Sequence, residues 1–301
     1  MSLLRFGGKD PEGNARGVNV DSEGNLAPDY FAIGAYQALY HEMFPDPLFR
    51  AFLADEYGIK SLSDAVNHGK GETTGFPFRQ TEGLPIRDYT GLELMVNTTR
   101  DIAIHDTEII TFPRIDNLTK LRFIRIEGLA AGNIESVGDF RYMSDLESIR
   151  MRNNNLFSIG DISDLPINFL ELGGNNLDQI DVTNFTDITR LDIQRNNLES
   201  MGSVSGLSSV NRIQAQENNL SGDIGDTSAL VSVNSLLRFF DNNFSQEDLE
   251  NIIDGLHSIR GALGDQNVSI ELEGNPGSSG AADSRDTEIS DLISAGCSVS
   301  I

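Results

Sequence analysis

The 301-residue sequence predicts a solenoid in which each turn contributes one short strand to a single parallel sheet. One apolar pattern recurs along the middle of the chain and always ends near an asparagine. The clearest of these, Asn154, Asn175, Asn196 and Asn218, are separated by 21, 21 and 22 residues. The segments between the copies have room for a tight turn or one 3₁₀ turn but not for a long helix. A fixed period of this length indicates stacked units that bury a continuous core.

Four copies of the pattern L-x-x-L-x-L-x-x-N-x-L carry this prediction: residues 146–156, 167–177, 188–198 and 210–220. The pattern resembles the leucine-rich repeat, in its short, internalin-like class. The resemblance implies one strand per turn, with inward apolar residues two apart, as in Ile149 and Met151. It also implies asparagine side chains that hydrogen-bond the backbone where the chain leaves each strand. The structural asparagines would be Asn154, Asn175, Asn196, Asn218, Asn242 and Asn275.

The frame continues less regularly on both sides of these copies. Its central apolar positions fall on Leu237 and Ile270 downstream and on Ile102 and Ile124 upstream. Leu129 and Thr107 take the asparagine position in the two upstream turns. We therefore predict an α/β leucine-rich-repeat solenoid of about eight turns with a parallel sheet. It would occupy residues 99–244.

The residues before the solenoid do not repeat. Residues 1–28 are rich in glycine, asparagine and aspartate, which predicts an extended arm with turns. Residues 29–98 are expected to form a small helical and irregular domain that docks on other proteins. Helical spacing predicts one helix from about Tyr30 to Met43 and a second from about Leu48 to Tyr57, and Ser61 begins a short third.

Residues 245–301 are expected to hold a last repeat and an αβαβ-like cap, because a solenoid end would otherwise expose core and strand edge. A capping box opens a helix at Ser245, with apolar residues as far as Ile259 on one stripe. A strand at 268–272, a loop at 274–280, a helix at about 285–295 and a terminal strand at 297–301 would follow.

The composition excludes several classes of ligand and chemistry. There are 46 acidic and 22 basic residues, giving a net charge of −24, which argues against bulk nucleic acid and anionic membranes as partners. The single cysteine, Cys297, excludes an internal disulfide framework, and the four histidines lack metal-ligand spacing. Since no catalytic constellation stands out, we expect a non-enzyme without catalytic residues, metal or cofactor.

The sequence also carries no membrane or secretion signal that we recognise. No run of 18 apolar residues predicts a membrane span, and no long apolar stretch follows a basic start at the N-terminus. We therefore expect synthesis in a cytoplasm without a cleaved signal.

The variable positions of the repeat predict the solvent-facing side of the strands. Over eight turns they hold nine arginines, ten carboxylates and no lysine, so this face is near neutral. Arginine and aromatic residues are enriched at interfaces. The candidate binding residues are Arg122, Phe123, Arg125, Arg150, Arg152, Phe169, Arg190, Arg195, Arg212, Arg238 and Phe240. The alternative is that arginine–carboxylate pairs across strands only make the sheet soluble.

Two resemblances suggest a setting for this face. Val18–Leu26 resembles the N-terminal segments of phage virion proteins. Leu292–Ile301 resembles the C-terminal segments of leucine-rich-repeat proteins from bacteria and phage genomes. In those proteins an aromatic residue often follows the glycine, whereas this chain has Cys297 at that position. They imply a virion component of the tail, baseplate or fibre region. Residues 1–98 would contact other virion proteins, and the strand face would bind a host receptor or glycan.

Two alternatives remain open. One is a bacterial adhesin or effector exported without a cleaved signal, located at the cell surface or in the cytoplasm. The other is an enzyme with its active site in residues 1–98.

Overall fold

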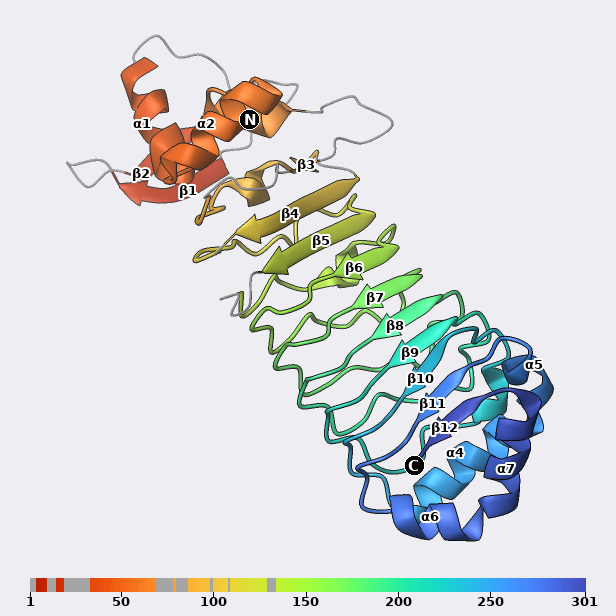
Figure 1. Ribbon diagram of the computed structural model, residues 1–301. Helices are drawn as coiled ribbons and strands as arrows, with labels where there is room; N and C mark the ends of the chain where they lie inside the picture. The colour runs from red at the N-terminus through yellow and green to blue at the C-terminus, as the bar shows by residue number, and fades with distance from the viewer. Residues whose placement is uncertain are drawn as a thin grey trace.

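The computed structural model describes residues 4–9, 15–18, 33–68, 78–79, 86–97, 100–107, 109–128 and 134–301. The described chain forms an elongated solenoid with one long sheet along its side (Figure 1). The sheet has ten strands in the order β12-β11-β10-β9-β8-β7-β6-β5-β4-β3, so successive strands along the chain are neighbours in space. All of these pairs are parallel. The predicted leucine-rich-repeat solenoid is therefore confirmed.

Most of the strands are very short and stay in register from turn to turn. Their bounds are β3 Phe78–Arg79, β4 Asp101–Thr107, β5 Phe123–Gly128, β6 Ser148–Arg150, β7 Phe169–Glu171, β8 Arg190–Asp192, β9 Arg212–Gln214, β10 Leu236–Arg238, β11 Ser269–Glu271 and β12 Ser298–Ser300. The central residue of each repeat lies opposite its counterpart in the next, as Leu170, Leu191 and Ile213 do. These three side chains are fully buried. The eight turns predicted from the frame correspond to β4 through β11.

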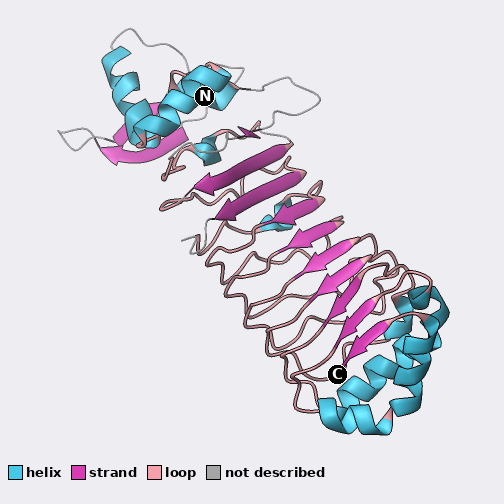
Figure 2. Cartoon of the chain, viewed as in Figure 1, coloured by secondary structure: helices cyan, strands magenta, loops and turns pink. Residues whose placement is uncertain are grey.

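The opposite side of the solenoid consists mainly of loops, with helices gathered at the two ends (Figure 2). The loops include three 3₁₀ turns: η1 Leu92–Leu94, η2 Phe140–Tyr142 and η3 Thr227–Ala229. Aspartates cap several of these bends. Asp161, Asp181 and Asp226 each accept a hydrogen bond from the backbone N–H two residues later, at 2.9–3.0 Å. A short side-chain acceptor at the start of each bend satisfies a backbone donor that would otherwise lack a partner.

The N-terminal region contains the three predicted helices, α1 Ile33–Met43, α2 Pro47–Tyr57 and α3 Leu62–Asn67. Asp46 caps α2 by accepting from the N–H of Leu48 at 2.7 Å, and Gly58 ends it in the left-handed region at φ 67°. Within the predicted arm, β1 Leu4–Lys9 and β2 Ala15–Val18 form an antiparallel pair. The rest of the arm, including most of the phage-like segment, lies outside the described residues.

The helices of this region pack on the first turns of the solenoid. The ring of Phe49 lies 5.2 Å from that of Tyr89, which lies 6.1 Å from the ring of Phe112. The N–H of Tyr89 donates to the carbonyl of Thr111 at 2.9 Å. The described residues of 33–68 and 86–97 therefore contribute to the same core as the repeats, and they cover one end of it.

Four helices cover the other end: α4 Gln246–Ser258, α5 Arg260–Gly264, α6 Ser278–Ser284 and α7 Asp286–Ala295. The loop predicted at 274–280 is wrong from Ser278 onward, where α6 begins. The glycines there disfavour a helix, but tertiary contacts decide. The hydroxyl of Ser278 donates to the carbonyl of Leu272 at 3.0 Å, and Ala281 is fully buried. None of the described helices is long and apolar enough to cross a membrane.

Candidate recognition surface

A column of buried asparagines fixes the position of every strand from β6 to β11. Each Nδ2 donates both within its own turn and to the turn before; that of Asn196 reaches the carbonyls of Ile193 at 3.0 Å and Leu172 at 3.1 Å. The Oδ1 of Asn196 accepts from the N–H of Leu177 at 3.0 Å. The same arrangement recurs at Asn175, Asn218, Asn242 and Asn275, and the amide of Asn154 donates likewise. Because the asparagines satisfy buried backbone groups where the chain turns, the strands are held in a fixed register.

The residue before each of these asparagines lies in the left-handed region. Two of the six are glycines, Gly174 and Gly274, and the other four are Asn153, Arg195, Glu217 and Asp241, with φ between 51° and 57°. Arg195, a predicted face residue, is therefore a turn residue at the rim, where its Nε lies 3.0 Å from the carboxylate of Glu217. The sequence frame does not distinguish this turn position from the positions on the strand.

The outward-facing side chains along the strands form a surface that we call the strand face. We define it as the outward residues of β5 to β11 and the second residue beyond each strand. Nine of the eleven predicted residues lie there: Phe123, Arg125, Arg150, Arg152, Phe169, Arg190, Arg212, Arg238 and Phe240. Arg122 lies just before β5, at the edge of this face. The structure therefore brings these residues to one side of the solenoid.

One buried carboxylate holds three of these arginines. Glu171 of β7 is 4% exposed, and its oxygens lie 2.7 Å from the Nε of Arg190, 3.4 Å from an Nη of Arg152 and 4.0 Å from the Nε of Arg150. Arg150 lies on β6 and Arg152 just beyond it, while Arg190 lies on β8, so the arginines reach Glu171 from both neighbouring strands. An acid so deeply buried requires cationic partners, so these arginines have a structural role.

A second acid, Asp192 of β8, is fully buried and pairs with Arg152. Gly173, two residues beyond β7, lies beside Asp192 and has no side chain; a Cβ there would lie 2.7 Å from Oδ1 of Asp192. Arg152 can therefore reach across β7. Burial raises the pKa of Asp192 above its ordinary value, and the charge of Arg152 partly offsets this. Gln194 then donates to Asp192 at 3.2 Å, and Gln216 donates to Gln194 at 2.6 Å.

Two aromatic rings on this face are already covered by guanidinium groups. The Arg150 guanidinium lies 4.8 Å from the ring centre of Phe169, and that of Arg122 lies 5.4 Å from the ring centre of Phe123. Arg122 also pairs with Glu147 at 2.5 Å, and Arg238 with Glu271 at 2.7 Å. Much of the face thus consists of arginines that are engaged in cation–π contacts and ion pairs.

Arg212 of β9 differs from these arginines. Within the described part of the chain it has no ion pair, and its Nε, like those of Arg152 and Arg190, is buried without a hydrogen-bond partner. Its register partner on β8 is another arginine, Arg190. Burial, followed by the charge of Arg190, lowers the pKa of Arg212 below its ordinary value.

The acids and amides that organise this face are not among the residues predicted from the sequence. Glu171, Asp192, Gln194 and Gln216 are all buried or half-buried. The signal was present, because each occupies a variable position of the repeat. A count of the charges shows that the face is near neutral, but it does not show which groups pair with each other.

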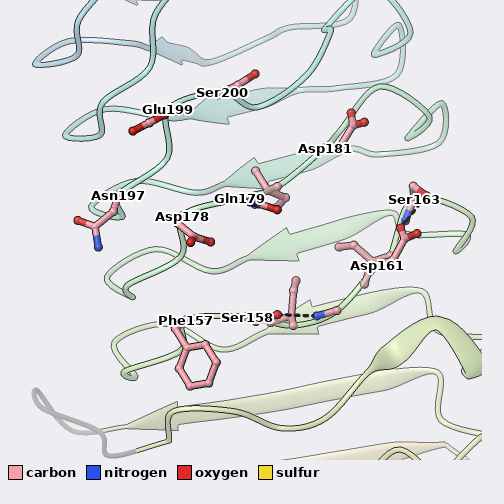
Figure 3. A pocket seen from close by; sticks show the side chains of 14 residues that line it. Phe157, Ser158, Asp161, Ser163, Asp178, Gln179, Asp181, Asn197, Glu199 and Ser200 are labelled. Atoms are coloured by element: carbon pink, nitrogen blue, oxygen red, sulfur yellow. Dashed lines mark hydrogen bonds between the residues drawn. The ribbon is translucent and has the colours of Figure 1, made fainter.

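A hollow lies on the loop side of the solenoid, away from the strand face. It has a volume of about 670 Å³ and is lined by three connecting segments, 157–163, 178–181 and 197–200 (Figure 3). Its side chains include the half-exposed Phe157 and four acids, Asp161, Asp178, Asp181 and Glu199. Among the described residues, no group of three or more histidines, cysteines or acids could hold a metal ion.

The comparisons with known proteins agree with this geometry at the level of fold. The sequence matches no protein-family model, and no curated protein is similar to it in sequence. The functional domain of InlJ from Listeria monocytogenes superposes with a TM-score of 0.55 at 19% identity, over 79% of this chain and 52% of that one. The fold is an internalin-like leucine-rich-repeat solenoid.

This chain spans about half the length of that InlJ domain. The InlJ domain includes a cysteine ladder, whereas the present chain has a single cysteine and stacks asparagines. Internalin C2 of Listeria monocytogenes is also similar, with a TM-score of 0.47 at 17% identity, over 71% of this chain and 92% of that one. The likeness to the InlJ domain describes the fold alone, and the strand face of this chain has its own residues.

Proposed function

We propose that this protein is a non-catalytic recognition protein and that its strand face binds a protein partner. The internalin-like solenoid is a fold suited to protein interaction. It presents a rigid, extended surface, because the asparagine column ties each turn to the next. No cofactor is required for such a role.

The observation that carries the proposal is the concentration of arginine on one face of an acidic molecule. On strands β6 to β10 and at the second residue beyond each, the outward side chains include five arginines and only two carboxylates. The chain as a whole carries −24. Arginine is favoured in interfaces because its planar group makes directed hydrogen bonds and stacks on rings. The distribution supports binding through this face and not through the acidic back.

A photo-crosslinking experiment tests the proposal. A benzoylphenylalanine replaces Phe240 on the strand face or Phe157 in the hollow on the back, and each variant is irradiated in its native host. Both changes replace a single phenylalanine, and Phe157 is the more exposed of the two, so a lower yield of adducts there would not be due to burial. We expect adducts of discrete mass at Phe240 and at least tenfold less at Phe157. Equal adducts at both sites, or adducts at Phe157 alone, would contradict the proposal.

The narrower setting that we propose is a phage virion, in the tail, baseplate or fibre region, with residues 1–98 docked on other virion proteins. The support is the sequence resemblance of Val18–Leu26 and Leu292–Ile301. A bacterial adhesin or effector, at the cell surface or in the cytoplasm, is the alternative. Mass spectrometry of purified particles, with and without the gene, separates the two: the virion setting predicts stoichiometric peptides in the particles, and their absence overturns it.

A further inference from the structure

The unpaired arginine at the centre of the strand face points to the chemistry of its partner. Arg150, Arg152 and Arg190 form ion pairs with Glu171 and Asp192, and Arg238 forms one with Glu271. Arg212 is left over. Resting on the proposed function, we propose that Arg212, flanked by Arg190 and Arg238, forms a carboxylate-binding centre that takes an aspartate or glutamate side chain from an acidic segment of a partner protein.

The surroundings of Arg212 favour an anion over a neutral group. On β8, Arg190 lies opposite Arg212. On β10, Leu236 lies opposite Arg212, and Arg238 follows two residues later. Leu236 itself is buried, at 8% exposure, and offers no polar group to the guanidinium from its side chain. On β8 the register partner Arg190 adds positive charge, and on β10 the register partner Leu236 adds no side-chain acceptor. The charge of Asp192, two residues further along β8, acts on Arg212 less strongly than that of Arg190.

Holding this arrangement without a ligand is unfavourable. Arg212 is partly buried among like charges, and an unsatisfied buried donor costs stability. Elsewhere on the same face this protein places an acid beside almost every arginine. A fold that left Arg212 without one would lose stability for no structural gain, whereas an incoming carboxylate would complete the pattern that Glu171 and Glu271 establish.

A carboxylate from a protein fits this face better than one from a sugar. Sugars are commonly held by stacking on an open aromatic ring, but Phe169 and Phe123 are covered by Arg150 and Arg122. The guanidinium of Arg212 is planar and forked, so it can hold a carboxylate through two hydrogen bonds. The flanking Gln214 and Gln216 are buried, and Gln216 donates to Gln194, so they provide a polar surface beneath an extended acidic segment.

A titration with a defined acidic peptide tests this centre. Hexaglutamate is added to the full-length ¹⁵N-labelled protein at low salt, and the arginine Nε–Hε signals are followed by NMR. We expect saturable binding in which the Arg212 signal shifts furthest. Arg212→Gln should weaken binding at least tenfold. Arg212→Lys should weaken it at least threefold, since the charge remains but the fork is lost.

Two controls make the result specific. Arg141→Gln removes an arginine of η2 that pairs with Asp139 on the loop side, and should change binding less than twofold. Hexaglutamate binding that survives Arg212→Gln, or no binding at all, overturns the carboxylate centre. An oligogalacturonate of matched charge that binds tenfold more tightly than hexaglutamate overturns the choice of a protein partner. The crosslinking at Phe240 reports on the strand face independently of these titrations, so failure of the centre and failure of the proposed function are distinguishable.

Discussion

The side-chain amide of Asn196 donates to the carbonyl of Leu172, an inward residue of the preceding turn, at 3.1 Å. It also donates to Ile193 in its own turn. One side chain therefore ties two turns of backbone together inside the core, and the repeat of this contact sets the spacing of the whole face.

Asn196→Ala should destabilise the protein by about 3 kcal/mol, because it leaves buried carbonyls and the N–H of Leu177 without partners. Asn197→Ala is the matched control: the neighbouring asparagine is exposed, and its replacement should change stability by less than about 0.5 kcal/mol. Urea unfolding followed by circular dichroism measures both. Equal changes in the free energy of unfolding for Asn196→Ala and Asn197→Ala would show that the asparagine column contributes little to stability.

The close packing of α5 on α7 gives a second prediction. A Cβ at Gly264 would lie 1.9 Å from the carbonyl oxygen of Ala295, so Gly264→Ala should force the helices apart and cost about 2 kcal/mol or more. In the same helix, Gly261 is exposed with nothing within 4 Å of the added methyl. Gly261→Ala should stabilise by up to about 1 kcal/mol through helix propensity. Thermal unfolding of both variants compares them, and a loss at Gly261 would be contrary to the packing described.

Asp192 should titrate above the ordinary aspartate value of 3.8, because burial disfavours its charge. The folded state then binds this proton more tightly than the unfolded state. The contribution of Asp192 to stability therefore falls as pH rises from 3.8 through the folded pKa. Asp116, whose pKa the hydrogen bond from Arg114 lowers, has the opposite slope: its contribution is lost as pH falls below 3.8.

Carbon-13 NMR of the side-chain carboxyls measures both pKa values directly. A value for Asp192 below that for Asp116 would contradict the described burial. In Asp192→Asn, the free energy of unfolding should decrease less as pH rises just above 3.8. In Asp116→Asn, it should decrease less as pH falls below 3.8.

Arg212→Met should raise the stability of the free protein. The change removes a partly buried charge from between Arg190 and Arg238 and keeps an unbranched apolar stem. We expect a gain of about 0.5–1 kcal/mol, or about 2 °C in Tm. By contrast, Arg190→Met should destabilise, because it removes the partner nearest to buried Glu171. Calorimetry compares the two; a loss at Arg212 of the same size as at Arg190 would mean that Arg212 is a structural residue.

The sequence was sufficient to predict the solenoid, because the same spacing of inward apolar residues and asparagine recurs in successive turns. Ile149, Leu170 and Leu191 each mark an inward position, and the following asparagine marks the turn. Gly58, Ser245 and Gly296 act locally at helix ends, so the helices that they bound could also be placed.

The remainder depends on contacts between turns, which the repeat frame does not encode. Helix α6 is stabilised by Ser278 reaching Leu272, although its own residues include glycine and serine. The pairing on the strand face depends on which side chain each arginine can reach: Arg152 crosses Gly173 to Asp192, while Arg212 meets another arginine. Composition gives the charges of the face but does not show that Arg212 has no ion pair within the described part of the chain.

Cryo-EM of the protein in its native assembly tests the central claim most directly. The account predicts density from a partner protein over the strand face, covering Arg212 and reaching Phe240, while the acidic loops around Phe157 remain open. A map in which the loop side is covered and the strand face meets only solvent would contradict it.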